Sequence, residues 1–290
     1  MQFNLYNDVK TFYRDTYDVL MRHEAQNLIP LGNVIIGNDG RDTAGWKNPA
    51  EWFMATITSE NGIVLTAIMT PPHNLTPYAT DNKISDEAIS CLTAGIIRNN
   101  IHVPGILADA GMALRFAKIF SEVKGVDHRI HEEMRIYELV RVNPDIPLIG
   151  KIRLVENRDM PFLPYWVEGF QHDCFGESPA AKADIGQYKY WIDKKKLYVL
   201  EHEGAPVSMA QKNREMQTVC GVGQVYTPPY FRGKGYASSC VAQVSDLILK
   251  SGFKKCVLYT NLANPVSNSI YQKIGYVPIC DSLQIKFGDN

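Results

Sequence analysis

Residues 225–237 constrain the fold of this 290-residue chain more than any other stretch. An apolar run leads into a loop that combines two cations with two glycines, Arg232, Gly233, Lys234 and Gly235, and a helical pattern follows. The first turn of a helix has unpaired N–H groups and partial positive charge, so it attracts anions. Glycine has no Cβ and adopts positive φ, which lets an anion approach the backbone closely. The stretch is typical of an anion-binding loop between a strand and a helix; an ordinary polar loop before a helix is the alternative.

Helices and strands alternate after this loop. Apolar residues at helical spacing predict a helix over residues 237–250, which ends at a serine and a glycine. A short apolar run predicts a buried strand at residues 256–260. A second helix is predicted over residues 266–274, after Asn264 and Pro265, and a last strand over residues 276–285.

In this order the pattern resembles the GNAT N-acetyltransferase superfamily over about residues 149–287. Two segments carry the resemblance, the loop at residues 232–237 and residues 264–276, where Asn264, Asn268, Tyr271 and Gly275 stand. The resemblance implies an N-acetyltransferase domain at residues 148–290. Such a domain transfers the acetyl group of acetyl-CoA directly to an amine acceptor in a ternary complex.

Residues upstream of the loop fit the same plan. A first strand is predicted at residues 151–155, and Asp159 is the expected N-cap of the helix that follows. Apolar runs at residues 196–200 and 206–210 flank a glycine-containing turn and predict a hairpin. Another hairpin leads into the strand that ends at Thr227.

The first half of the chain repeats this order in weaker form. A helix is expected over residues 5–28, a hairpin around the turn at residues 59–62, and a helix capped by Ser85. A strand, a helix and a strand complete the set up to residue 143. The sequence therefore predicts an α/β protein with two tandem GNAT-like domains, each a mixed central sheet flanked by helices. The first, degenerate domain spans residues 1–143.

The first domain is expected to lack the anion loop. Residues 71–77 occupy the corresponding place in the predicted order, and Pro71 and Pro72 there remove N–H donors. We therefore predict that only the second domain binds a cofactor. The turn-rich residues 143–147 are the expected linker.

The resemblance implies roles for particular residues. Backbone groups of Val225, Tyr226 and Thr227 are candidates to pair with the amide-containing arm of CoA. The diphosphate is expected on backbone N–H groups of Arg232, Gly233, Lys234, Gly235, Tyr236, Ala237 and Ser238. Asn264 and Asn268 match positions that face the thioester.

Tyr271 is the predicted catalytic residue. A phenol of pKa about 10 can donate its proton to a leaving thiolate whose conjugate acid has a pKa of about 8–9. The alternative is a tyrosine that packs beside Ile270 and Ile274 in the core.

A general base is not assigned. An amine of pKa about 10 arrives protonated and must lose a proton before it attacks. Many relatives carry a carboxylate on the strand before the anion loop, whereas residues 217–227 contain neither Asp nor Glu. Four residues are candidates, each with solvent exposure as the alternative: His172, Asp173, Glu177 and Glu201. Residues 173–187 are expected to face the acceptor.

Composition excludes several classes of function. The net charge of −1 gives no field that attracts nucleic acid or an anionic membrane, and no apolar run is long enough for a membrane span. Six cysteines without a Cys-x-x-Cys pair favour reduced thiols, so we expect a cytoplasmic protein. No metal site is predicted, because the histidines at residues 128–133 lack a zinc-binding spacing.

The expected partner is a small-molecule or peptide amine, and a homodimer is left open. Two other functions also stay open. One is a non-catalytic acyl-CoA-binding regulatory module, which the missing carboxylate favours. The other is a tandem-GNAT transferase of aminoacyl or longer acyl groups.

Overall fold

The computed structural model describes residues 1–40, 48–176 and 185–288. Its backbone contacts divide the chain into two compact units. The first unit comprises Met1–Ile136 together with Ile279–Asn290, and the second comprises Tyr137–Pro278. Within the described ranges, no helix is long and apolar enough to cross a membrane.

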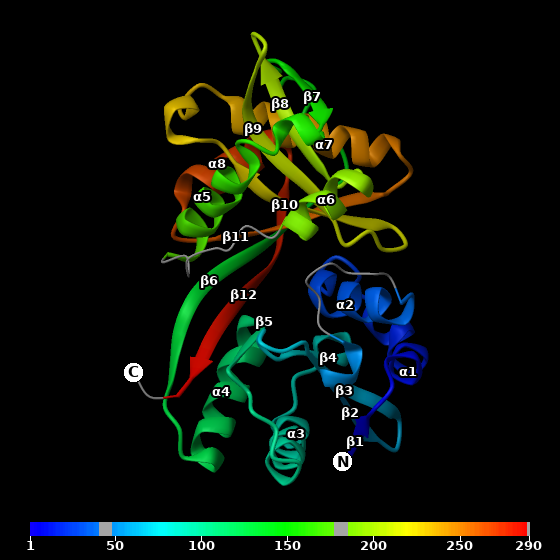
Figure 1. Cartoon of the computed structure of the whole chain (residues 1–290). Coiled ribbons are helices and arrows are strands. Elements are labelled where there is room, and N and C mark those ends of the chain that lie inside the picture. Colours follow the sequence, from blue (N-terminus) through cyan, green and yellow to red (C-terminus); the bar gives the residue numbers. More distant parts are fainter. Residues whose placement is uncertain (41–47, 177–184, 289–290) are drawn as a thin grey trace. The chain divides into compact units, whose positions relative to one another are not determined.

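The two units follow one order of elements, strand, two helices, three strands, helix, strand, helix, strand (Figure 1). The first set is β1 Gln2–Tyr6, α1 Val9–Met21, α2 Leu28–Asn38, β2 Phe53–Ser59, β3 Gly62–Met69, β4 Thr76–Ala79, α3 Asp86–Arg98, β5 Gly105–Asp109, α4 Ala110–Lys124 and β6 His128–Leu139. The second set is β7 Lys151–Leu154, α5 Leu163–Phe175, α6 Ile185–Asp193, β8 Leu197–His202, β9 Ala205–Asn213, β10 Val219–Tyr226, α7 Tyr236–Lys250, β11 Lys255–Asn261, α8 Pro265–Ile274 and β12 Val277–Phe287. The predicted tandem α/β architecture is thus confirmed.

The N-terminal helix is shorter than predicted, because a strand precedes it. Residues 2–6 form β1, which pairs antiparallel with β2 and opens the sheet β1-β2-β3-β4. The Asp8 side chain then caps α1 by accepting a hydrogen bond of 2.8 Å from the backbone N–H of Thr11. This cap fixes the start of the helix at Val9, and α1 ends at Met21, so the expected helix over residues 5–28 is wrong at both ends.

The β2–β3 hairpin and the Ser85 cap are confirmed, but the expected position of the missing anion loop is wrong. Residues 71–77 lie between β3 and β4, whereas the segment that corresponds to the anion loop joins β4 to α3. That segment has no glycine, and the Ser85 side chain occupies the N–H of Ala88. Asp86 and Glu87 also place negative charge in the first turn of α3, which disfavours an anion there.

The sheet of the second unit has the strand order β6-β11-β10-β9-β8-β7. The predicted hairpin is β8–β9, and β9–β10 is the next antiparallel pair. β10 pairs with β11 in parallel, so a crossover helix, α7, joins them. The buried stripe of α7 packs against this sheet and includes Cys240, Val241, Val244 and Ile248.

Asp159 does not cap α5 as predicted. That helix begins at Leu163, and Asp159 lies in the short 3-10 helix Asn157–Asp159 before it. Its carboxylate instead receives two hydrogen bonds from the Arg153 guanidinium, at 2.7 and 2.9 Å, and one from the Glu156 N–H. The partner of this buried carboxylate is thus the Arg153 guanidinium and not, as predicted, the N-terminus of α5.

Two strands continue from one unit into the other. Residues of β6 from Tyr137 onward belong to the second unit. β12 leaves the second unit after Pro278, and its residues 282–286 pair antiparallel with β5 in the first unit. The sequence places all of residues 148–290 in one domain, so the compact units differ from the predicted ranges at both strands. The ranges 1–143 and 148–290 stay predictions of independently folding domains.

Candidate functional site

Strands β10 and β11 diverge near the middle of β10. They pair in parallel at Val219↔Lys255, Cys220↔Cys256 and Gly221↔Val257, and within the described residues no pair follows. On its other side, β10 pairs with β9 up to Gly223 and again at Tyr226, with a bulge in between. The divergence leaves an edge of β10 beside a gap in the ladder, where an extended ligand can pair with the backbone.

The end of β10 is held by side chains. The Ser208 hydroxyl donates to the carbonyl of Tyr226 at 3.1 Å and lies 2.9 Å from the Thr227 hydroxyl. The Arg232 Nε donates to the carbonyl of Thr227 at 2.9 Å. Two of the predicted backbone groups, the carbonyls of Tyr226 and Thr227, therefore already have protein donors. Val225 lies beyond Gly221, the last residue of β10 that pairs with β11 in the described part of the chain.

The predicted anion loop has the expected backbone. Gly233 and Gly235 adopt φ of +77° and +80°, and Gly235 is the N-cap residue of α7 without a side-chain cap. The first intrahelical bond runs from the N–H of Ser239 to the carbonyl of Gly235 at 3.0 Å. The N–H groups of Tyr236, Ala237 and Ser238 precede this bond and, within the described residues, have no backbone acceptor outside the helix, so these donors are available to an anion.

Polar side chains of α7 fix this helix to the segment that leads into β7. The Ser239 hydroxyl donates to the carbonyl of Ile149 at 2.8 Å and accepts from its N–H at 2.9 Å. Gln243 accepts from the N–H of Ile152 at 3.1 Å and donates to the carbonyl of Gly150. These bonds anchor the first turns of α7, where the N–H donors lie.

The two cations of the loop have different surroundings. Arg232 forms an ion pair with Asp173 near the end of α5, and its guanidinium carbon lies 5.8 Å from the centre of the Tyr226 ring. The Lys234 amino group lies 5.2 Å from the centre of the Tyr230 ring, and Tyr230 is exposed. The Arg232 charge is thus partly neutralised within the protein.

A pocket of about 550 Å³ opens between the end of β10, the loop, α5 and α8. All predicted site residues except Lys234 and Asn268 line it: Val225, Tyr226, Thr227, Arg232, Gly233, Gly235, Tyr236, Ala237, Ser238, Asn264 and Tyr271. Asp173, a candidate base, and Cys174, in the expected acceptor-facing segment, also line the pocket. The sequence analysis did not predict six further lining residues: Phe170, Phe231, Val266, Ser267, Ile270 and Lys273. Val266, Ile270 and Lys273 follow helical spacing, which is a signal that could have found them once Tyr271 was chosen.

Tyr271 lines the pocket and is 8% exposed. Burial raises the pKa of its hydroxyl above the ordinary value, and the nearby Cys174 adds to the shift. Its ring lies between those of Tyr137 and Tyr276, with centroids 6.5 and 5.9 Å away. Within the described residues, its hydroxyl forms no hydrogen bond. The ring therefore packs in the core, as the alternative interpretation required, while the side chain still reaches the pocket.

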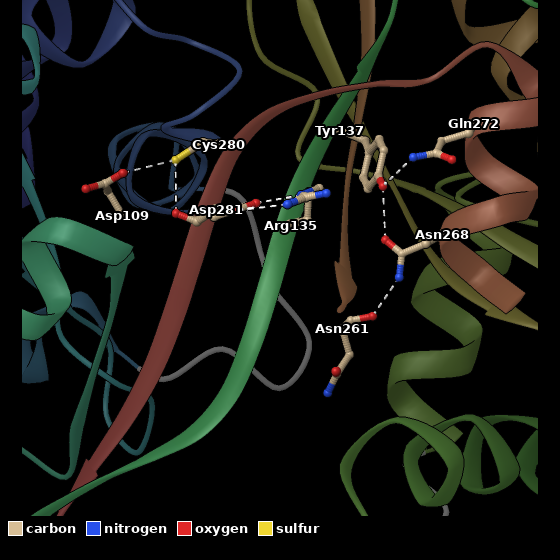
Figure 2. A network of polar contacts seen from close by, with 8 residues as sticks. All are labelled: Asp109, Arg135, Tyr137, Asn261, Asn268, Gln272, Cys280 and Asp281. Carbon is tan, nitrogen blue, oxygen red and sulfur yellow. Dashed lines mark hydrogen bonds and ion pairs between the residues drawn. The ribbon is translucent and has the colours of Figure 1, made fainter. Parts of the chain in front are cut away.

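The two asparagines of the second motif are placed differently. Asn264 caps α8 by accepting from the N–H of Ser267 at 3.0 Å, and it lines the pocket. Asn268 is not among the lining residues, because it is engaged in a network with Tyr137 and with backbone carbonyls (Figure 2). No sequence pattern pointed to Tyr137, which stands 131 residues from Asn268.

Of the four candidate bases, Asp173 is the one that lines the pocket in the described part of the chain. Glu201 is paired with Arg153 at 2.6 Å, and the exposed His172 does not line the pocket. Glu177 lies outside the described residues, as does much of the expected acceptor-facing segment at 173–187. Among described side chains, no group of three or more His, Cys, Asp or Glu could hold a metal ion.

Comparisons with known proteins agree with this architecture. Residues 202–284 match the family model of FR47-like proteins. No curated protein matches the chain in sequence. A GNAT-family acetyltransferase from Colwellia psychrerythraea is 11% identical with a TM-score of 0.60, covering 100% of both chains. A GCN5-related N-acetyltransferase from Sphaerobacter thermophilus is 13% identical with a TM-score of 0.62, covering 99% of this chain and 97% of its own.

A tandem GNAT protein from the clavulanic acid biosynthesis pathway is also similar. It is 12% identical with a TM-score of 0.54, and the match covers 99% of this chain and 98% of that protein. The predicted resemblance is thereby confirmed: residues 202–284 match the FR47-like family, and the chain has the fold of GNAT acetyltransferases, including a tandem one.

Proposed function

We propose that this protein is an N-acetyltransferase that transfers the acetyl group of acetyl-CoA directly to an amine acceptor in a ternary complex. The observation that carries the proposal is one pocket lined by the diverging end of β10, the uncapped N-terminus of α7 and Tyr271. The first two features suit an extended ligand with an anionic end, and the third supplies a protic group.

The residues present fit an acyl-CoA. The N–H groups of Tyr236, Ala237 and Ser238 would hold its diphosphate, since glycines at positive φ leave the approach to them open. The free edge of β10 at Val225 would pair with its amide-containing arm. When bound, acetyl-CoA supplies an activated acyl thioester.

Tyr271 is suited to hold and deliver a proton at its hydroxyl oxygen. Because burial raises its pKa, the hydroxyl stays protonated at neutral pH. The same low-polarity surroundings also raise the pKa of a thiol that leaves there, so the pKa of the proton acceptor rises together with that of the donor. The proton of Tyr271 would thus neutralise the sulfur as its bond to the acyl carbon breaks.

Deprotonation of the amine requires a base in or near the pocket. Asp173 lines the pocket but is engaged by Arg232, and β10 carries no carboxylate. A water relay or release of Asp173 from Arg232 would meet the need.

Acetyl-CoA turnover against a panel of amines, with free thiol as the readout, tests the proposal. Thiol release that depends on an amine is the expected result. CoA binding without thiol release under any acceptor would indicate the non-catalytic binding module instead. A series of acetyl-, butyryl- and longer acyl-CoA donors separates acetyl transfer from transfer of longer groups. The refuting result is a chain that neither binds CoA nor releases thiol.

A further inference from the structure

The start of α8 is tied to β6 and β11 by a compact polar network (Figure 2). The Tyr137 hydroxyl on β6 donates to Oδ1 of Asn268 at 3.0 Å and accepts from Nε2 of Gln272 at 3.3 Å. The Asn268 amide nitrogen donates to the carbonyls of Asn261, at 2.9 Å, and Asn264, at 2.7 Å. One tyrosine thus contacts two side chains of α8 that are one helical turn apart.

We propose that Tyr137 and Asn268 form a positioning pair that sets the place of Tyr271 in the pocket. The proposal rests on the function proposed above and deepens it, because it assigns Asn268 to the placement of α8 rather than to contact with the cofactor. Within the described residues, Tyr137 does not line the pocket and forms no hydrogen bond with a residue that does. Its hydroxyl therefore acts through Asn268 and Gln272.

The hydrogen-bond inventory of Asn268 supports this assignment. Both N–H groups of a primary amide are needed to serve two carbonyls, and the amide oxygen serves Tyr137. The side chain therefore has no donor left for a thioester carbonyl. Those two carbonyls end β11 and begin α8, so Asn268 fixes the turn from which the helix starts.

Helix geometry connects this network to Tyr271. Asn268 and Gln272 lie one turn apart, and Tyr271 stands between them in sequence, three residues after Asn268. The Tyr137 ring packs beside the Tyr271 ring, at a centroid distance of 6.5 Å, and is fully buried. A rigid buried anchor on one face of α8 thus limits rotation and translation of the hydroxyl that reaches the pocket.

Removal of the anchoring oxygen leaves the amide oxygen of Asn268 without its donor. Such a loss lets α8 shift, and misplacement by about 1 Å can lower a rate about 100-fold. We expect Tyr137→Phe to lower single-turnover acetyl transfer about 10- to 100-fold, while CoA affinity stays within about twofold. In a Tyr271→Phe background, the same substitution should lower the rate less than about twofold, because its effect acts through the Tyr271 hydroxyl.

Tyr276→Phe is the matched control. Tyr276 is equally buried, and its ring also packs against Tyr271, but its hydroxyl bonds to Ser245 on α7 at 2.8 Å. It should lose similar stability and keep most of the transfer rate. Equal rate losses in the Tyr137 and Tyr276 variants would overturn the proposal, and so would a Tyr137 effect that persists unchanged without the Tyr271 hydroxyl.

Hydrogen exchange of the full-length chain provides a readout that needs no activity. Tyr137→Phe should speed amide exchange in residues 265–274, and Tyr276→Phe should not. Unchanged exchange there in the Tyr137 variant would refute the anchor whatever the rates. If the wild-type chain releases no thiol from acetyl-CoA, the proposed function fails, while the exchange data still decide the role of the network.

Discussion

Replacement of Gly235 by valine is expected both to destabilise the fold and, through a separate effect, to weaken CoA binding. Gly235 has φ +80°, and a Cβ built there would lie 3.4 Å from Cδ1 of Ile149, an ordinary van der Waals contact. The valine side chain therefore has enough space. The destabilisation comes from the left-handed backbone at this position, which costs about 1–2 kcal/mol of folding free energy for a residue other than glycine.

The binding loss has a separate origin. A branched side chain at the N-cap of α7 stands beside the N–H groups of Tyr236 and Ala237, which would hold the diphosphate. Loss of one charge-assisted hydrogen bond is worth about 1.5–3 kcal/mol, which corresponds to about 10- to 150-fold in Kd. Titration calorimetry with CoA, beside thermal unfolding of the same sample, measures both quantities.

Gly252→Val is the matched control, because it follows the other end of the same helix. Gly252 also has positive φ, +108°, and no atom lies within 4 Å of a Cβ built there. It should lose comparable stability and bind CoA normally. A folded Gly235→Val variant with wild-type CoA affinity would show that the diphosphate does not use this turn.

Three further predictions concern single side chains. Tyr271→Phe should slow acetyl transfer by about 10²–10⁴-fold and leave CoA affinity within a few-fold, as single-turnover and titration measurements would show. Because burial raises the pKa of Tyr271, its ionisation should cause no loss of the wild-type rate below a pH of about 10. Asp173→Asn should tighten CoA binding by up to about fivefold, the scale of an exposed ion pair, because it frees Arg232; unaltered affinity in low and high salt would mean that Arg232 does not meet the phosphates. Asp159→Asn should lower the free energy of unfolding by about 3 kcal/mol at pH 7, because it breaks a buried pair with Arg153. Burial alone would raise the pKa of Asp159, but the guanidinium outweighs it and lowers that pKa, so this stabilisation is present above a pH of about 4 and disappears below it. Urea unfolding at several pH values should show that the free energies of unfolding of the wild-type and Asp159→Asn proteins converge in acid. A difference that stays constant with pH would contradict the pairing.

Local chemistry in the sequence predicted much of the fold and the loop. Ser85 before acidic residues, and two glycines before a helical stripe, each specify a helix start within a few residues. Asp159 shows the limit of such reasoning. Its pattern is that of an N-cap, yet its carboxylate pairs with Arg153, which lies six residues earlier on the preceding strand.

Hydrogen-bond partners that are far apart in the chain could not be predicted from local sequence patterns. Asn268 was predicted to face the cofactor because it stands in a motif with Tyr271, but its amide is occupied by Tyr137 on β6, by Asn261 on β11 and by the cap of its own helix. No periodicity links residues so far apart. The separation of β10 from β11 likewise depends on where parallel pairing stops, at Gly221, which no local signal marks.

The passage of β12 into the first unit has a consequence for how the protein is made. Leu283 and Ile285 belong to the core of that unit, and Phe287 packs against Phe116 and Phe120. On the ribosome, these residues appear some 150 positions after Ile136, or roughly 8–30 seconds later at about 5–20 residues per second. The core of the first unit is therefore complete only after residues 283–287 have been synthesised. Until then, nascent chains expose the apolar faces of β5 and α4.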